Sequence, residues 1–329
     1  MPVRQPEFDC CNSVQDWKGG TAVENYDKLL EQETTPEALE STVNYLVRLI
    51  KPFLQTLEPV LICFPDEGPA SLGGVFKEAV QRCEALPVFW GPRYTWKELL
   101  RVAFDTHANT LIGHPLAILG LTKLAMFTGT PLYIYDVIAA GEPFPRWVVN
   151  SLKNGLDCKV WGCYAVRSGP VIAGFSCTQE AGIHIREDVF KPILEIDGNE
   201  PAGMVRGRLR FDSVKSPGEY YDPEQLAYVQ HQPCSCGCDS PRIVENLSVN
   251  RGSLSRAVLE EKLLSWSSVL DYRAIETESG LNLEVVVFPG ELLPRLPTCA
   301  KLTVRNWNPE EDVPFYLLEH DMKFTEINR

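Results

Sequence analysis

The chain has 329 residues, of which 44% are apolar and 23% are charged, and its formal net charge is −13. These are ordinary values for a globular protein, and the length allows two domains with a sizeable core. The acidic balance and the short basic clusters, such as the one at residues 206–210, argue against nucleic acid as a partner.

The N-terminal part begins without the basic and apolar regions of a signal peptide. The run Thr34-Thr-Pro-Glu37 then offers a helix N-cap with an acidic first turn. Apolar residues recur at helical spacing from Leu39 to Leu54. We therefore expect one long amphipathic helix that ends at about Leu57.

From Pro59 onward, short apolar runs alternate with amphipathic stretches. The runs are residues 60–64, 86–90, 110–114, 132–140 and 158–162, and the amphipathic stretches begin near Ser71, Thr95, Pro115 and Phe144. Short apolar runs separated by helices are typical of buried parallel strands. In such an open sheet, ligands bind beyond the carboxyl ends of the strands. A pocket is expected at the turns after His114, Ala140 and Trp161.

The most apolar region, residues 110–141, is interrupted by a histidine, a lysine and prolines, so we expect no membrane span. Past Gly182, shorter alternating segments at 182–185, 193–197 and 207–214 indicate antiparallel strands packed against the first sheet. From about Asn246 follow a helix (254–264), a hairpin (272–288), a strand (301–307) and a polar tail.

These patterns predict an α/β fold with an open, mostly parallel sheet flanked by helices, and with an antiparallel subregion. The expected core domain covers residues 1–245, and a small α+β domain covers residues 246–329.

The cysteines are the strongest chemical signal. There are eleven, an odd number, and no export signal accompanies them, which favours reduced thiols in the cytoplasm over a disulfide framework. Cys234, Cys236 and Cys238 surround Gly237 in one short run, while Cys177 and His184 supply a thiol and an imidazole from a separate segment.

Zinc takes four such ligands in a tetrahedron. We predict one zinc ion on Cys177, His184, Cys234 and Cys236, with Cys238 as the alternative thiol. The competing interpretations are small buried residues or a redox-sensitive surface turn. A catalytic zinc is not expected, since no HExxH pattern occurs.

Other catalytic motifs are absent from the sequence. It contains no GxSxG, GxxxxGK[ST] or GxGxxG, and its five histidines have no nearby serine or cysteine partner. His114, at a strand end before Pro115, is expected either to line a pocket or to cap a helix.

The order of several segments resembles the phenylacetate-CoA ligase branch of the AMP-forming adenylating enzymes. The segments are EGPASLGGVFKEA (67–79), TLIGHPLAIL (110–119), GEP (141–143), WG (161–162), CTQEAGIHIREDVFKPILEID (177–197) and CSCGCDSPRI (234–243). The similarity covers the chain from Phe64 to its C-terminus. In that family a carboxylate attacks the α-phosphate of ATP, and the acyl-adenylate then passes to a thiol, commonly coenzyme A.

The resemblance implies roles for individual residues. Gly141, Glu142 and Pro143 would border the adenine, and Trp161 of the Trp161-Gly162 pair would replace the tyrosine that stacks on it. His114 and Tyr164 would line the pocket for a small carboxylic acid or acyl group. The C-terminal domain would bring a lysine to the site, for which Lys323 is the candidate. The resemblance also implies a homodimer, and it makes the zinc structural.

The sequence departs from the family pattern at three ATP motifs. Residues 1–63 lack a phosphate loop, as though the N-terminal part were shortened, and Ala165 replaces the glutamate that would hold Mg²⁺. The RYxTGD segment appears as residues 219–224, which leaves Glu224 as the ribose ligand.

These changes predict atypical or lost use of ATP, AMP and Mg²⁺. Two hypotheses follow: a ligase-like enzyme acting on a carboxylate, acyl-adenylate or acyl thioester, or a catalytically degenerate homologue that binds a ligand or serves as a scaffold. A partner protein could supply the missing phosphate-binding part.

Overall fold

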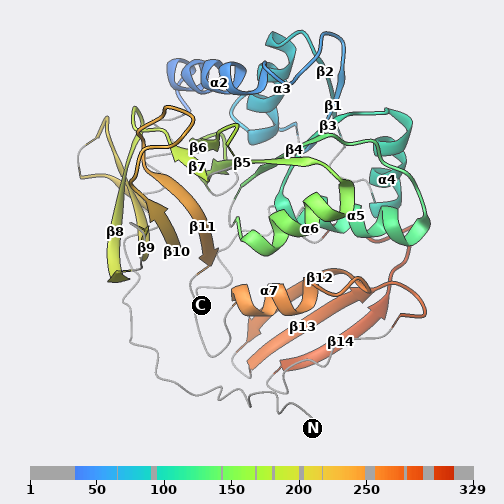
Figure 1. Ribbon diagram of the computed structural model, residues 1–329. Coiled ribbons are helices and arrows are strands. Elements are labelled where there is room, and N and C mark those ends of the chain that lie inside the picture. Colours follow the sequence, from blue (N-terminus) through green and yellow to red (C-terminus); the bar gives the residue numbers. More distant parts are fainter. Residues whose placement is uncertain are drawn as a thin grey trace.

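The computed structural model is a mixed α/β structure (Figure 1). It describes residues 34–64, 66–89, 95–141, 144–166, 169–179, 182–199, 204–216, 218–248, 256–277, 280–291 and 300–314. The helices are α2 (Pro36–Ile50), α3 (Leu72–Arg82), α4 (Trp96–Asp105), α5 (Pro115–Thr128), α6 (Arg146–Leu156) and α7 (Arg256–Leu264). None of the described helices is long and apolar enough to cross a membrane.

The strands alternate with helices in the first half of the chain and follow one another in the second. They are β1 (Pro59–Cys63), β2 (Leu86–Phe89), β3 (Thr110–Gly113), β4 (Asp136–Ala140), β5 (Lys159–Ala165), β6 (Ile172–Ser176), β7 (Ile183–Ile185), β8 (Phe190–Asn199), β9 (Met204–Ser213), β10 (Tyr220–Gln230), β11 (Arg242–Ser248), β12 (Val269–Thr277), β13 (Gly280–Val287) and β14 (Ala300–Asn306).

One large sheet organises the core domain. Its strand order in the described chain is β2-β1-β3-β4-β5-β6-β7-β11-β10-β9-β8. Strands β1 to β5 pair in parallel, whereas every pairing from β5/β6 to β9/β8 is antiparallel. The expected parallel sheet and antiparallel subregion are both present, but the antiparallel strands do not pack against the first sheet as expected. The antiparallel strands continue the parallel sheet edge to edge, because β6 pairs directly with β5.

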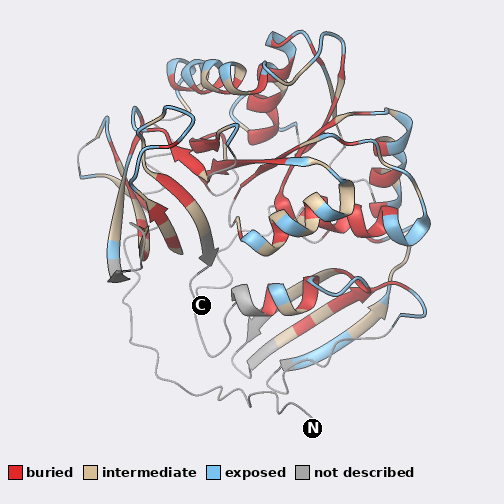
Figure 2. Ribbon diagram, viewed as in Figure 1, coloured by how far each residue is buried: buried red, intermediate tan, exposed pale blue. Residues whose placement is uncertain are grey.

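Helices cover both faces of the parallel half, and Figure 2 shows buried residues along its strands. Alternate residues of a strand point to opposite faces. In β1, Leu61 and Cys63 pack with α4, α5 and α6, whereas Val60 and Ile62 pack with α2 and α3. This burial on both faces explains why the parallel strands read as continuous apolar runs.

Local sequence signals set the helix starts. Thr95 and Glu98 form a capping box at α4, and the side chains of Thr35 and Ser71 cap α2 and α3. Pro115 occupies the first position of α5, and Gly129 ends that helix with a φ of 66°. Such caps satisfy backbone groups that the helix leaves unpaired at its ends.

Two sequence boundaries are corrected. Helix α2 ends at Ile50 and not near Leu57, because Pro52, which follows the C-cap residue Lys51, has no amide hydrogen with which to continue the helix. The strand expected over residues 132–140 begins only at Asp136. The preceding Tyr133 and Tyr135 are exposed and lie outside the ladder with β3, which starts at Thr110↔Asp136.

The C-terminal unit consists of α7 and a second sheet of order β12-β13-β14. It lies beside α5, and its buried residues Leu263, Val269 and Val285 belong to the same apolar cluster as α4 and α5 (Figure 1). The Lys123 ammonium of α5 donates to the carbonyl oxygens of Trp266 and Val269 at 3.0 and 2.8 Å. The unit is thus docked on the core through a continuous buried interface. The domain boundary at residues 245/246 stays a prediction.

Candidate metal centre

Strands β6 and β7 position the first two candidate ligands. Cys177 follows the last residue of β6, and His184 is the middle residue of β7, paired with Phe175 of β6. The strands approach closely at Gly174, where a Cβ atom would meet the carbonyl oxygen of His184. The thiol thus comes from the residue directly after β6, and the imidazole comes from the neighbouring strand β7.

The turn between β10 and β11 brings the other candidates. The Cys234 amide donates to the Cys238 carbonyl at 3.1 Å, and the Gly237 amide donates to the Cys234 carbonyl at 2.9 Å. Gly237 has a φ of 87°, a conformation that glycine adopts without strain. Because β11 pairs with β7 at Arg242↔His184, the turn lies against the imidazole.

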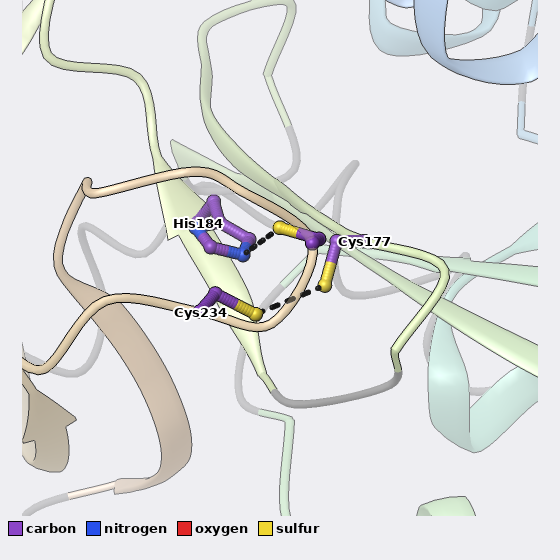
Figure 3. Close-up of side chains that lie close together, drawn as sticks. Cys177, His184 and Cys234 are labelled. Carbon is purple, nitrogen blue, oxygen red and sulfur yellow. Dashed lines mark hydrogen bonds between the residues drawn. The ribbon is translucent and has the colours of Figure 1, made fainter.

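The four predicted ligand atoms form one cluster, and the side chains labelled in Figure 3 converge from separate segments. All four atoms lie within 4.8 Å of one another. The Sγ atoms of Cys177 and Cys234 are 3.7 Å apart, and Cys236 Sγ lies 3.5 Å from His184 Nε2. A zinc tetrahedron with ordinary bond lengths has S···S edges of about 3.8 Å and S···N edges of about 3.6 Å. The donor set and these two distances fit zinc.

The fifth candidate ligand, Cys238, lies outside this cluster. Cys238 Sγ is 2.9 Å from Ser240 Oγ, and no group of metal-binding side chains among the described residues includes it. The geometry therefore favours Cys234 and Cys236 over the Cys238 alternative.

The pKa values of two cysteines in the metal-free cluster also favour the binding of a cation. Burial alone raises the pKa of Cys234, but hydrogen bonds from Cys236, His184 and Cys177 outweigh it and lower that pKa to about 6. Burial and the neighbouring thiols Cys234 and Cys177 raise the pKa of Cys236 to about 11. One thiolate therefore suppresses ionisation of the next, and a divalent cation would relieve this repulsion.

The imidazole of His184 has one nitrogen free for a metal. Its Nε2 faces Cys236, whereas Nδ1 is buried and has no hydrogen-bond partner in the described structure. A neutral ring with its proton on Nδ1 would leave the Nε2 lone pair for zinc.

Of the residues assigned to the adenine, the structure describes Gly141 and Trp161, which lie at the neighbouring strands β4 and β5. Gly141 directly follows β4, has a φ of 119° and donates its amide hydrogen to the carbonyl oxygen of Cys163. Trp161 lies opposite Ile138, further back along the sheet. Glu142, Pro143 and Lys323 lie outside the described residues, and Glu224 belongs to β10 without a described side chain.

The ring of Trp161 is already covered. Phe53, from the segment after α2, stacks on it with ring centroids 5.1 Å apart and an interplanar angle of 3°. The indole Nε1 donates to Asp136 Oδ1 at 2.7 Å, and only 7% of the residue is exposed. An adenine could stack on Trp161 only after Phe53 moves.

The other site residues are also packed into the interior. His114 is the N-cap of α5, and its Nδ1 accepts from the Leu116 amide at 3.3 Å. Tyr164 is fully buried, and its hydroxyl donates to Gln225 at 3.0 Å. At Gly162 a Cβ atom would press against Ile183 and Phe144. One cavity lies beside the candidate metal centre, and another lies at the C-terminal ends of α5 and α6.

Sequence reasoning did not identify the two residues that contact the Trp161 side chain, Phe53 and Asp136. The sequence pattern predicts Phe53 as part of a long helix and Asp136 as one residue of a longer strand. Neither carries a motif, so only the paired strands and the turn after α2 bring them to Trp161.

No protein-family model matches the sequence, and no curated protein matches it. Solved structures do share its fold. A 2-hydroxyisobutyryl-CoA ligase in the postadenylation state, in complex with an AMP conjugate, has a TM-score of 0.61 at 13% identity, over 86% of this chain and 72% of that one.

Two further structures give weaker matches. The amide bond synthetase McbA from Marinactinospora thermotolerans has a TM-score of 0.51 at 11% identity, over 86% of this chain and 64% of that one. An anthranilate CoA ligase in complex with anthranoyl-AMP has a TM-score of 0.51 at 11% identity, over 85% and 62%. The chain therefore has the fold of adenylate-forming ligases. Identities this low establish the fold alone.

Proposed function

We propose that this chain is an adenylate-forming ligase-like protein of the phenylacetate-CoA ligase branch that acts on a carboxylate, acyl-adenylate or acyl thioester. The observation that carries the proposal is the ligase fold over 86% of the chain. Coenzyme A is the thiol acceptor that the branch suggests, and a small aryl or alkyl acid is the substrate class.

Use of ATP is atypical or lost in this proposal. Ala165, which replaces the Mg²⁺-binding glutamate, is fully buried in the cluster around α2 and α3. An apolar methyl group there cannot coordinate a cation. The stack of Phe53 on Trp161 would further oppose adenine binding.

ATP–pyrophosphate exchange with a panel of aryl and alkyl acids tests this function. The expected result is little or no exchange with ATP, together with binding of an acyl-adenylate or acyl thioester, seen as a thermal shift. Robust exchange would show ordinary adenylation, and the absence of any shift with ATP, AMP, CoA or acyl conjugates would argue against an enzyme of this class.

The second candidate is a catalytically degenerate homologue that binds a ligand or serves as a scaffold. The covered Trp161 ring and the docked C-terminal unit favour it, because rotation of that unit would expose a buried apolar interface. Acyl transfer by purified protein from an acyl-adenylate to a thiol would eliminate this candidate.

We further propose that zinc at Cys177, His184, Cys234 and Cys236 is structural. When bound, the ion would cross-link the β6/β7 segment to the turn between β10 and β11. Metal analysis of protein purified without added zinc should give about one zinc per chain.

The other proposals concern assembly and location. A homodimer is tested by light scattering during size-exclusion chromatography, and a partner that supplies the phosphate-binding part by copurification from the native cell. A cytoplasmic location is tested by fractionation, and the two-domain division at 245/246 by limited proteolysis.

A further inference from the structure

A cavity of about 320 Å³ lies beside the candidate metal centre. Cys177, His184 and Cys236 contribute to its wall, so this side of the cluster borders the cavity. The remaining thiol ligand, Cys234, is buried. The volume is that of a small-molecule site.

The rest of the wall is largely apolar and aromatic. Tyr45 and Leu49 come from α2, Phe175 comes from β6, and Ile185 comes from β7. These side chains suit a ligand with an apolar body. The guanidinium of Arg186 lies 4.9 Å from the ring centroid of Tyr45 and already occupies one face of that ring, so the apolar contacts of a ligand would fall mainly to the other side chains.

The charges around the cavity are negative. A zinc ion with three thiolates has a net charge of about −1. Glu187 and Asp188 belong to the same wall and are exposed. The buried Arg186 pairs with Asp188 at 3.2 Å and so balances that carboxylate. Glu187 has no ion pair with any basic residue that the structure describes, so its charge is uncompensated.

We propose that this cavity binds a small organic cation, a primary amine with an aryl or alkyl body. The apolar body would pack on Leu49 and Phe175, and the ammonium group would face Glu187 and the thiolate side of the metal centre. The same charges disfavour a carboxylate here. The cavity is thus a different site from any acyl pocket at the carboxyl ends of β3, β4 and β5.

Calorimetric titration of the full chain tests this proposal, with phenethylamine as the probe, and 2-phenylethanol and 3-phenylpropionate as neutral and anionic controls. We expect the amine to bind and both controls to bind at least about tenfold more weakly. Glu187→Gln should weaken amine binding by about three- to tenfold. The matched variant Glu291→Gln removes an exposed carboxylate outside the cavity wall and should leave binding unchanged.

A cavity-filling variant locates the site. Leu49→Trp should abolish amine binding while the zinc content stays at the wild-type level. Equal binding of the amine and the alcohol, an unchanged affinity in Glu187→Gln, or no binding of the amine at millimolar concentration would each overturn the proposal.

Part of the charge argument rests on the zinc proposed above, so metal content is measured in the same samples. Zinc-free protein that binds the amine through Glu187 would end the zinc proposal and support the cation site. Zinc-loaded protein that does not bind the amine would overturn the cation site alone.

Discussion

Replacing Cys234 by serine should remove the zinc cross-link and destabilise the fold. Cys177 and Cys234 are 57 positions apart, and their Sγ atoms are 3.7 Å apart. Closing a loop of that length lowers the entropy of the unfolded chain enough to stabilise the folded state by about 4 kcal/mol. A serine hydroxyl stays protonated and is a poor zinc ligand, so Cys234→Ser should lose about that amount.

Urea unfolding of paired variants measures this effect. Cys234→Ser should have a free energy of unfolding about 4 kcal/mol below the wild type. The control Cys238→Ser should differ by less than about 1 kcal/mol, since the Cys238 thiol contacts Ser240 and not the cluster. Removing metal with a chelator should bring the wild type to the level of Cys234→Ser and leave that variant unchanged.

Several results would refute the reasoning. If Cys238→Ser lost the metal and Cys236→Ser kept it, the ligand assignment would be wrong. If the wild type held zinc but Cys234→Ser unfolded at the same urea concentration, the ion would not cross-link the two segments. Wild-type protein without metal would end the proposal altogether.

Three other substitutions test the packing. Burial lowers the pKa of Lys123 to about 7, only partly opposed by Asp271, so the folded state binds fewer protons than the unfolded state above that pH. Wild-type stability should therefore rise between pH 7 and 9, by up to about 1.4 kcal/mol per pH unit relative to Lys123→Met, in urea titrations at each pH. Equal slopes would contradict this. Phe53→Ala should cost about 2 kcal/mol and make Trp161 fluorescence sensitive to AMP; a response already present in the wild type would show that Phe53 does not block the ring. Gly174→Ala should cost more than about 3 kcal/mol in thermal unfolding and reduce zinc content, because its Cβ would meet the His184 carbonyl; native metal content would disprove that clash.

Much of the parallel half could be predicted from the sequence. Each apolar run from residue 60 to residue 162 overlaps a strand, and the helices begin within about two residues of the expected positions. The hydrophobic periods of two and 3.6 residues are local properties of the sequence. They can therefore be recognised without knowing which segments pack together. The predicted start of β4 is wrong because an apolar run reflects composition over several residues and does not mark where pairing begins. Tyr133 is apolar enough for a strand but lies before the first residue pair between β3 and β4.

The sequence also predicts that the four side chains of the candidate metal centre lie together, since ligand type and spacing limit the arrangements that a tetrahedral ion accepts. The choice of Cys236 over Cys238 needed the turn at Gly237, in which backbone hydrogen bonds direct one thiol to His184 and leave the other beside Ser240.

The sequence by itself determined the alternation of strands and helices and the soft side chains of the candidate cluster. Only the tertiary structure decided that Phe53 covers Trp161 and that the antiparallel strands extend the parallel sheet. It also decided that Lys123 of α5 donates hydrogen bonds to the C-terminal unit. The physical reason is that the first set depends on residue type and local period. The second depends on contacts between segments far apart in the chain, for which no residue carries a local signal.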